Sequence, residues 1–274
     1  MNDFRSRFEV MGILNVTPDS FSDGGEYNDI DRALERARAM VAAGADWLDI
    51  GGESTRPGAS AVSEQEELNR VVPVIEAIAR ELPVKISVDT SKPAVMRAAV
   101  AAGAKMINDV RALREPGALA AAAQAVQTHQ VGVCLMHMQG QPRTMQEHPE
   151  YADLIGDIHD FFQERIRDCE NAGISRSHIY LDPGFGFGKT LRHNYELLKR
   201  LPAFHDLGLP LLIGISRKSM LGQVTGRDVA DRMPASVAAA TIAMLQGAAI
   251  LRVHDVAETK DAVQVVTTML NGDN

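Results

Sequence analysis

Short apolar runs alternate with longer, Ala-rich and charge-flanked segments from one end of the chain to the other. The apolar runs predict strands at residues 10–16, 47–50, 84–88, 106–110, 131–136, 179–181, 211–215 and 250–253. The longer segments predict helices at residues 31–43, 64–81, 93–102, 116–128, 151–172, 191–201, 234–246 and 257–270. Such an alternation is typical of repeated βα units.

About eight βα units in 274 residues match the size of a closed (β/α)8 TIM barrel, which is the predicted fold. An open, doubly wound sheet is the alternative. The sequence contains no linker-like composition shift and no low-complexity tract, so we expect one domain over residues 1–274, with residues 1–9 as a short lead-in.

Composition narrows the class of protein. The chain is 45% hydrophobic and 23% charged, and its formal charge of −8 argues against nucleic acid or an anionic membrane as the main partner. Charges at Asp3 and Arg5 interrupt any secretory signal, and no apolar run is long enough to span a bilayer. The chain has two cysteines, Cys134 and Cys169, which are too few for a disulfide framework. We therefore expect both thiols to be reduced and the protein to be cytoplasmic.

Polar residues stand at the carboxyl ends of the predicted strands, where barrels of this kind carry their active sites. They are Asn15, Asp49, Asp89, Asn108, His137, Asp182, Ser216 and Arg252, with Glu53, Lys218 and His254 close behind. Any single Asp or Asn among them could instead cap the next helix. Together they predict a polar site at the mouth of the barrel.

The glycine-rich segment 182–190 resembles a phosphate-binding P-loop, but Pro183 stands where that motif requires glycine. The segment also lacks the dinucleotide-binding spacing. We therefore expect its backbone to lie close to a flat ligand, with the ring of Phe185 or Phe187 stacked against that ligand. The alternative is that one of these rings belongs to the hydrophobic core. Two further loops, at 17–25 and 51–58, are expected to lie over the mouth and close on substrate, although ordinary surface turns are the alternative.

Lys218 follows an apolar strand and is open to three interpretations: a Schiff-base nucleophile, a charged donor to a carbonyl oxygen, or a solvated surface residue. Arg252 and His254 lie two residues apart, so a strand directs both side chains to the same side. A cation and an imidazole at this position suit an anion such as phosphate.

Several blocks of sequence, taken in order, closely resemble bacterial dihydropteroate synthases. They are MGILNVTPDSFSDGG at 11–25, DIGGESTRPG at 49–58, SVDT at 87–90, IND at 107–109, MHMQG at 136–140, DPGFGFGK at 182–189, SRKS at 216–219 and RVH at 252–254. The match covers nearly the whole chain from residue 10 onward. Many family members have a longer lead-in before the first block.

The resemblance implies a pterin-binding barrel, usually a homodimer, that uses Mg²⁺ and joins 6-hydroxymethyl-7,8-dihydropterin diphosphate to 4-aminobenzoate, releasing diphosphate. By analogy, the pterin is held by Asp89, Asn108, Asp182 and Lys218. Asn15 is expected to bind Mg²⁺, and Arg252 and His254 are expected to hold the diphosphate. Near the diphosphate or the aminobenzoate, the resemblance places Thr55, Arg56 and Ser216. Phe187 and Val253 complete the expected substrate-binding set. Asp89, Lys218, Arg252 and His254 are the expected catalytic residues.

These roles suit the chemistry. A carboxylate accepts the paired 2-amino and N3–H donors of a pterin, and a cation donates to its O4, which favours the non-covalent role for Lys218. The expected mechanism is dissociative: diphosphate leaves first, and the arylamine attacks a pterin cation held near Asp89. The alternatives are a pterin-binding methyltransferase, which has no need of a diphosphate site, a Schiff-base aldolase using Lys218, and a non-catalytic pterin carrier.

Overall fold

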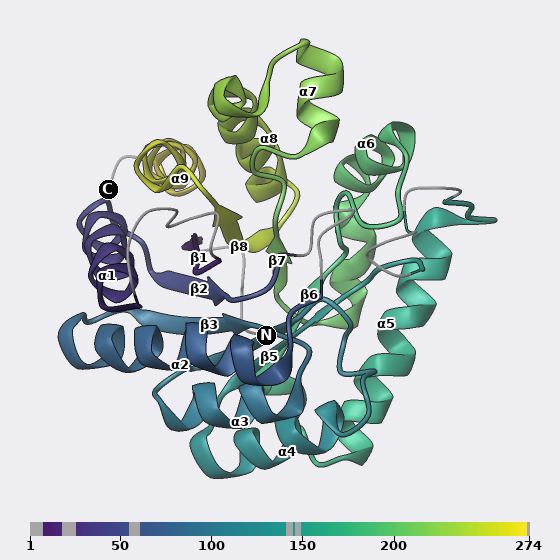
Figure 1. Cartoon of the computed structure of the whole chain (residues 1–274). Coiled ribbons are helices and arrows are strands. Elements are labelled where there is room, and N and C mark those ends of the chain that lie inside the picture. The colour runs from purple at the N-terminus through teal and green to yellow at the C-terminus, as the bar shows by residue number, and fades with distance from the viewer. Residues whose placement is uncertain (1–7, 18–25, 55–60, 141–144, 146–148, 273–274) are drawn as a thin grey trace.

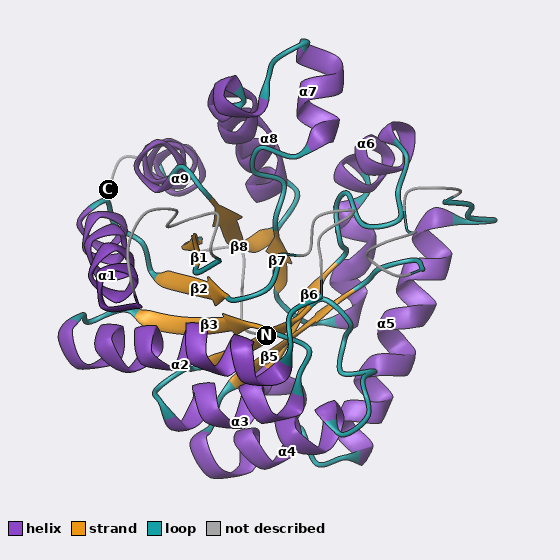
Figure 2. Cartoon of the chain, viewed as in Figure 1, coloured by secondary structure: helices purple, strands orange, loops and turns teal. Residues whose placement is uncertain are grey.

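Eight parallel strands close into a barrel in sequence order, with β1 beside β8, and helices surround them (Figures 1 and 2). This computed structural model describes residues 8–17, 26–54, 61–140, 145 and 149–272. The strands are β1 Glu9–Asn15, β2 Trp47–Gly51, β3 Lys85–Asp89, β4 Met106–Asp109, β5 Gly132–Met136, β6 Ile179–Asp182, β7 Leu211–Ile213 and β8 Ala248–Val253. The predicted (β/α)8 barrel is confirmed, and every predicted strand is present.

The described helices form the outer ring. They are α1 Glu26–Ala42, α2 Glu64–Glu81, α3 Pro93–Ala101, α4 Ala118–His129, α5 Leu154–Asn171, α6 Leu191–Lys199, α7 Ser219–Thr225, α8 Met233–Leu245 and α9 Val256–Asn271, with short 3-10 helices η2 Arg176–His178, η3 Leu201–Leu207 and η4 Val229–Asp231. The prediction for α1 began five residues late, and α7 and the 3-10 helices were missed. No helix among the described residues is both long and apolar enough to cross a membrane.

Alternation along the strands divides the core into two layers. Leu14, Ile50 and Val88 face outward into the large apolar cluster between strands and helices. Residues of the opposite parity, including Met11 and Trp47, form a second cluster inside the barrel.

The amino-terminal end of the barrel is closed by a small polar group. Glu9 accepts hydrogen bonds from Trp47 Nε1 at 2.6 Å and from Lys85 Nζ at 2.6 Å. Lys85 also lies 4.3 Å from the centre of the Trp47 ring. Side chains of β1, β2 and β3 therefore fill this end of the barrel.

Candidate active site

Strand register brings the polar strand ends into one layer at the carboxyl end of the barrel. Asn15 pairs with Gly51, Gly51 with Asp89, and Asp89 with Asn108. Because side chains in register on adjacent strands point the same way, the polar members of this row project into the mouth together. Gly51 adds no side chain to this row, and its Cα lies close to both neighbours, because a Cβ there would make ordinary contacts with Asn15 Oδ1 at 3.6 Å and Asp89 Cβ at 3.5 Å.

Arg252 of β8 lies at the centre of this layer. Its Nε donates to Asp49 Oδ2 at 2.6 Å, and its Nη2 donates to Asp89 Oδ2 at 2.8 Å. Asn108 Nδ2 donates to the same Asp49 oxygen at 3.2 Å. One guanidinium thus bridges two carboxylates, and the prediction that these strand ends meet is confirmed.

Burial perturbs the charges of this cluster. It raises the pKa of Asp89 to about 7, and the neighbouring carboxylate of Asp49 adds to the rise while Arg252 opposes it. For Arg252, burial lowers the pKa, but Asp49 and Asp89 outweigh it and hold that pKa above its usual value. Near neutral pH, Arg252 therefore stays protonated, whereas Asp89 can gain or lose its proton.

Asp182 and Lys218 form the second half of the mouth. Asp182 ends β6, is 5% exposed and accepts a hydrogen bond from Gly184 N at 2.8 Å. Lys218 donates to the carbonyl of Phe185, and its Nζ lies 4.7 Å from the centre of the Phe187 ring. The solvated-surface interpretation of Lys218 is therefore wrong.

Electrostatics couples these two residues. Burial lowers the pKa of Lys218 to about 8, partly offset by the negative charge of Asp182. Burial raises the pKa of Asp182, and Lys218 opposes that rise. Of the two phenylalanines, Phe185 is fully buried core and Phe187 is half-buried beside Lys218, which leaves Phe187 as the ring available to a ligand.

Ser216 and His254 join the ends of β7 and β8. Ser216 Oγ lies 3.0 Å from His254 Nδ1 and accepts from the His254 backbone N–H at 3.1 Å. Val253 points the other way, into the apolar cluster around the barrel, so its side chain is core and any contact with substrate falls to its backbone. Next to these residues, Arg217 forms an ion pair with Asp255.

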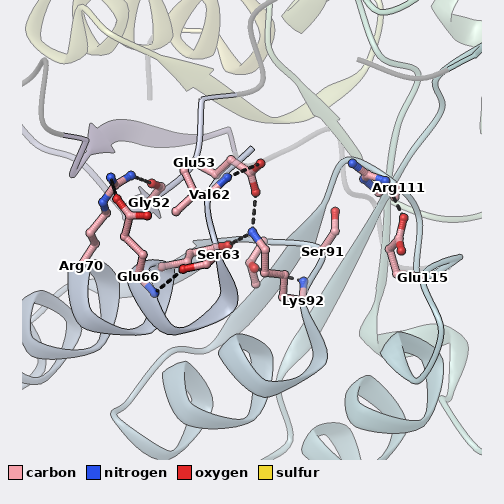
Figure 3. A network of polar contacts seen from close by, with 12 residues as sticks. Gly52, Glu53, Val62, Ser63, Glu66, Arg70, Ser91, Lys92, Arg111 and Glu115 are labelled. Atoms are coloured by element: carbon pink, nitrogen blue, oxygen red, sulfur yellow. Dashed lines mark hydrogen bonds and ion pairs between the residues drawn. The ribbon is translucent and has the colours of Figure 1, made fainter. Parts of the chain in front are cut away.

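The loop after β2 is held at both of its described ends. Glu53 Oε1 accepts from the Val62 backbone N–H at 3.3 Å, and Glu53 Oε2 accepts from Lys92, which also donates to the buried Glu67 (Figure 3). Burial works to lower the pKa of Lys92, but these two hydrogen bonds raise it above its usual value. Thr55 and Arg56 lie outside the described residues, as does most of the loop at 17–25.

Comparison with known proteins decides between the pterin-dependent alternatives. Residues 11–254 match the family model of pterin-binding enzymes. The chain is 56% identical over 262 residues, 96% of its length, to dihydropteroate synthase of Escherichia coli K12, covering 92% of that protein. The chain belongs to the dihydropteroate synthases.

Solved structures of dihydropteroate synthases agree. The Yersinia pestis enzyme in a sulfonamide complex has a TM-score of 0.92 at 57% identity, covering 98% of this chain and 96% of that one. The Xanthomonas albilineans enzyme with 4-aminobenzoic acid has a TM-score of 0.91 at 50% identity, covering 98% and 95%. The methyltransferase, aldolase and carrier alternatives receive no support from these relatives.

The donor set at the mouth of this dihydropteroate synthase suits Mg²⁺. No group of three or more His, Cys, Asp or Glu side chains within the described part of the chain is arranged to hold a metal ion. Mg²⁺, however, commonly takes one or two protein oxygens and completes its shell with water and substrate phosphates. The Asn15 amide oxygen, beside Gly51 and Asp89, is an uncharged oxygen donor of the type that can serve such an ion.

Two buried residues of the mouth were given no role from sequence. Asp49 was recognised as a polar strand end, but its contact with Arg252 joins residues 203 positions apart. Lys189 lies in the rejected P-loop segment and ends the family-like block at 182–189, but the sequence assigns it no role, and it is 3% exposed. A local signal existed for Asp49, since a charge inside a predicted strand is costly unless it is paired. Lys189 lies seven residues beyond the end of β6, so no comparable signal marked it.

Proposed function

We propose that the polar mouth binds 6-hydroxymethyl-7,8-dihydropterin diphosphate and joins it to 4-aminobenzoate, giving 7,8-dihydropteroate and diphosphate. The observation that carries this proposal is the buried Asp182 carboxylate beside Lys218 and the half-buried Phe187 ring. A pterin offers neighbouring 2-amino and N3–H donors, a carbonyl acceptor and a flat ring. Each of these features has a partner in this group of three residues.

The rest of the cluster suits the reaction that follows. Asp89 and Asn108 supply further polar contacts to the pterin edge, next to Arg252. Arg252 and His254, with Ser216 held against His254, are the groups proposed to hold the departing diphosphate. Mg²⁺ held in part by Asn15 would supply additional positive charge to the diphosphate oxygens.

The proposed order of bond changes is dissociative. Cleavage of the bond between the exocyclic carbon and oxygen leaves both electrons on diphosphate and a positive charge shared by the pterin ring. Asp89 is the carboxylate assigned to stabilise that charge, and a neighbouring cation favours its ionised form. The arylamine nitrogen then bonds to the exocyclic carbon and gives up one proton.

Diphosphate release, measured with and without 4-aminobenzoate while dihydropteroate is followed by mass, tests the proposed activity. We expect release coupled to dihydropteroate. Pterin binding with no product would contradict it.

Single substitutions test the assignments of individual residues. Asp182→Ala should weaken pterin binding by about a hundredfold, because it removes a charged acceptor for two donors.

Arg252→Ala should mainly lower kcat, because the leaving group loses its cation. Turnover that survives Arg252→Ala at the normal rate would refute the leaving-group role.

A homodimer and a cytoplasmic location complete the proposal. Large exposed apolar side chains concentrate in the last quarter of the chain, at Val224, Val229, Ile242, Leu245, Val265, Met269 and Leu270. Exposed apolar groups gathered on neighbouring helices favour contact with another subunit. Cys134 and Cys169 are both buried as free thiols, which suits a reducing compartment.

A further inference from the structure

Lys189 is a buried ammonium group that no step of the proposed reaction uses. Its Nζ donates to the carbonyl oxygens of Gly184 at 3.0 Å and Phe187 at 3.1 Å, and it lies 3.0 Å from His137 Nδ1. A lysine ammonium has three donors and no acceptor, so His137 Nδ1 accepts and the imidazole carries its proton on Nε2. All three donors of Lys189 therefore have partners.

The three acceptors belong to two different segments. Gly184 and Phe187 lie in the loop that follows β6, whereas His137 follows β5. The same two segments are also joined through the backbone, since His137 N donates to Asp182 O at 2.8 Å. Gly184 lies so close to His137 that a Cβ on it would fall 1.9 Å from the His137 carbonyl oxygen. Lys189 thus ties the loop both to itself and to the neighbouring strand end.

This loop presents the groups assigned to the pterin. Asp182 begins it, the Phe185 carbonyl accepts from Lys218, and the Phe187 ring lies beside Lys218 Nζ. The carbonyl of Phe187 is itself an acceptor for Lys189. A change in the Lys189 contacts would therefore move both the Phe187 ring and the Phe185 carbonyl that accepts from Lys218.

We propose that Lys189 is a positioning residue for pterin binding: its ammonium group fixes the loop that carries Asp182, the Phe185 carbonyl and Phe187. The inference rests on the proposed pterin site and adds to it a residue that touches no substrate atom. Lys189 acts through the backbone of the loop.

Keeping a charge in this buried position has an electrostatic cost. Burial lowers the pKa of Lys189 to about 7, Asp182 opposes this, and Lys218 adds to it. Burial and the Lys189 charge together hold the pKa of His137 far below its usual value, so the ring stays a neutral acceptor. A buried cation with this cost is retained where its three donors define a conformation that an apolar residue would leave undefined.

Lys189→Met tests the proposal, because methionine matches the length of lysine but donates no hydrogen bond. Binding of 6-hydroxymethyl-7,8-dihydropterin diphosphate, KM for each substrate and kcat would be measured for the full-length protein. We expect the pterin Kd and KM to rise about tenfold, with a smaller change in the aminobenzoate KM and in kcat. Lys85→Met at the opposite end of the barrel is the matched control, and its pterin Kd should not change.

Tyr151→Phe is a milder second variant, useful if Lys189→Met does not fold. The Tyr151 hydroxyl donates to the Gly188 carbonyl of the same loop at 2.8 Å, so its removal should raise the pterin Kd about threefold. Reduced thermal stability with an unchanged pterin Kd in both variants would overturn the inference, leaving Lys189 merely structural. Failure of the proposed function would look different: the unmodified protein, with Asp182→Ala as reference, would show no pterin binding at all.

Discussion

Lys218 keeps its ammonium group in surroundings that favour the neutral amine. Burial lowers its pKa to about 8, while Asp182 and the Phe185 carbonyl stabilise the charged form. A cation destabilised in this way gains from a new acceptor, since the carbonyl oxygen of a ligand adds a hydrogen bond to the charged form. Lys218 is therefore suited to donate to a pterin carbonyl.

This pKa predicts that pterin affinity and protein stability change in opposite directions with pH. The affinity should fall as pH rises through about 8, because the ammonium donor is lost. The contribution of Lys218 to stability should increase from about pH 8 towards pH 10.5, because the folded protein gives up its proton before the unfolded chain does. Pterin Kd and urea unfolding measured from pH 7 to 9.5 check both. In Lys218→Met, both trends should weaken, and the rise in stability that remains should be the part due to Lys189, whose pKa burial lowers to about 7. Trends of unchanged size would assign the titration to another group.

Single residues were predictable where their signal was local. Asp89, Asn108 and Asp182 stand out from sequence because a polar residue that ends an apolar strand needs a reason. Asp49 and Arg252 stand out in the same way, but their contact with each other was not predictable, since it depends on closing the barrel. The choice between Phe185 and Phe187 was equally undecidable, because the path of the loop determines which ring is buried.

Among the elements, the glycine-rich loop after β6 depends most on backbone conformation. Gly184 and Gly226 have nearly equal φ values, +71° and +68°. They differ in surroundings, because a Cβ at Gly184 would collide with the His137 carbonyl, whereas nothing lies within 4 Å of one at Gly226. The pair separates backbone strain from close packing.

Gly226→Ala should cost about 1 kcal/mol of unfolding free energy, which is the strain of a left-handed alanine. Gly184→Ala should cost more than that and should also weaken pterin binding, because the loop must move away from His137. Urea unfolding and pterin Kd for both variants check this. Equal losses of stability, with pterin affinity intact in both, would refute a tight loop.

Element boundaries followed from sequence where apolar periodicity was strong. All eight strands and most helices were predicted within a few residues. The first turn of α1 has a polar sequence with no apolar repeat, so its start at Glu26 was missed. The α7 helix, Ser219–Thr225, is too short for a repeat and contains Gly222, whose missing side chain leaves room for Arg232.

At the scale of the whole molecule, the barrel separates stability from chemistry. Its amino-terminal end is filled by Glu9, Trp47 and Lys85, and an apolar layer follows. The charged cluster lies at the opposite end, where the loops that follow the strands can reach it. The fold was predictable from repeat number and composition, but the bottom plug was not, because Glu9 and Lys85 are 76 residues apart.

The outer surface carries the last prediction. The helices α8 and α9 lie side by side (Figure 1) and expose Ile242, Leu245, Val265 and Met269. If this surface joins two subunits, light scattering after size exclusion should give twice the mass of one chain. Leu245→Asp should then produce monomers, because a buried, unpaired charge would be placed in the contact. Leu191→Asp on α6, also at an exposed leucine, is the matched control and should remain dimeric; dimers that survive Leu245→Asp would place the contact elsewhere.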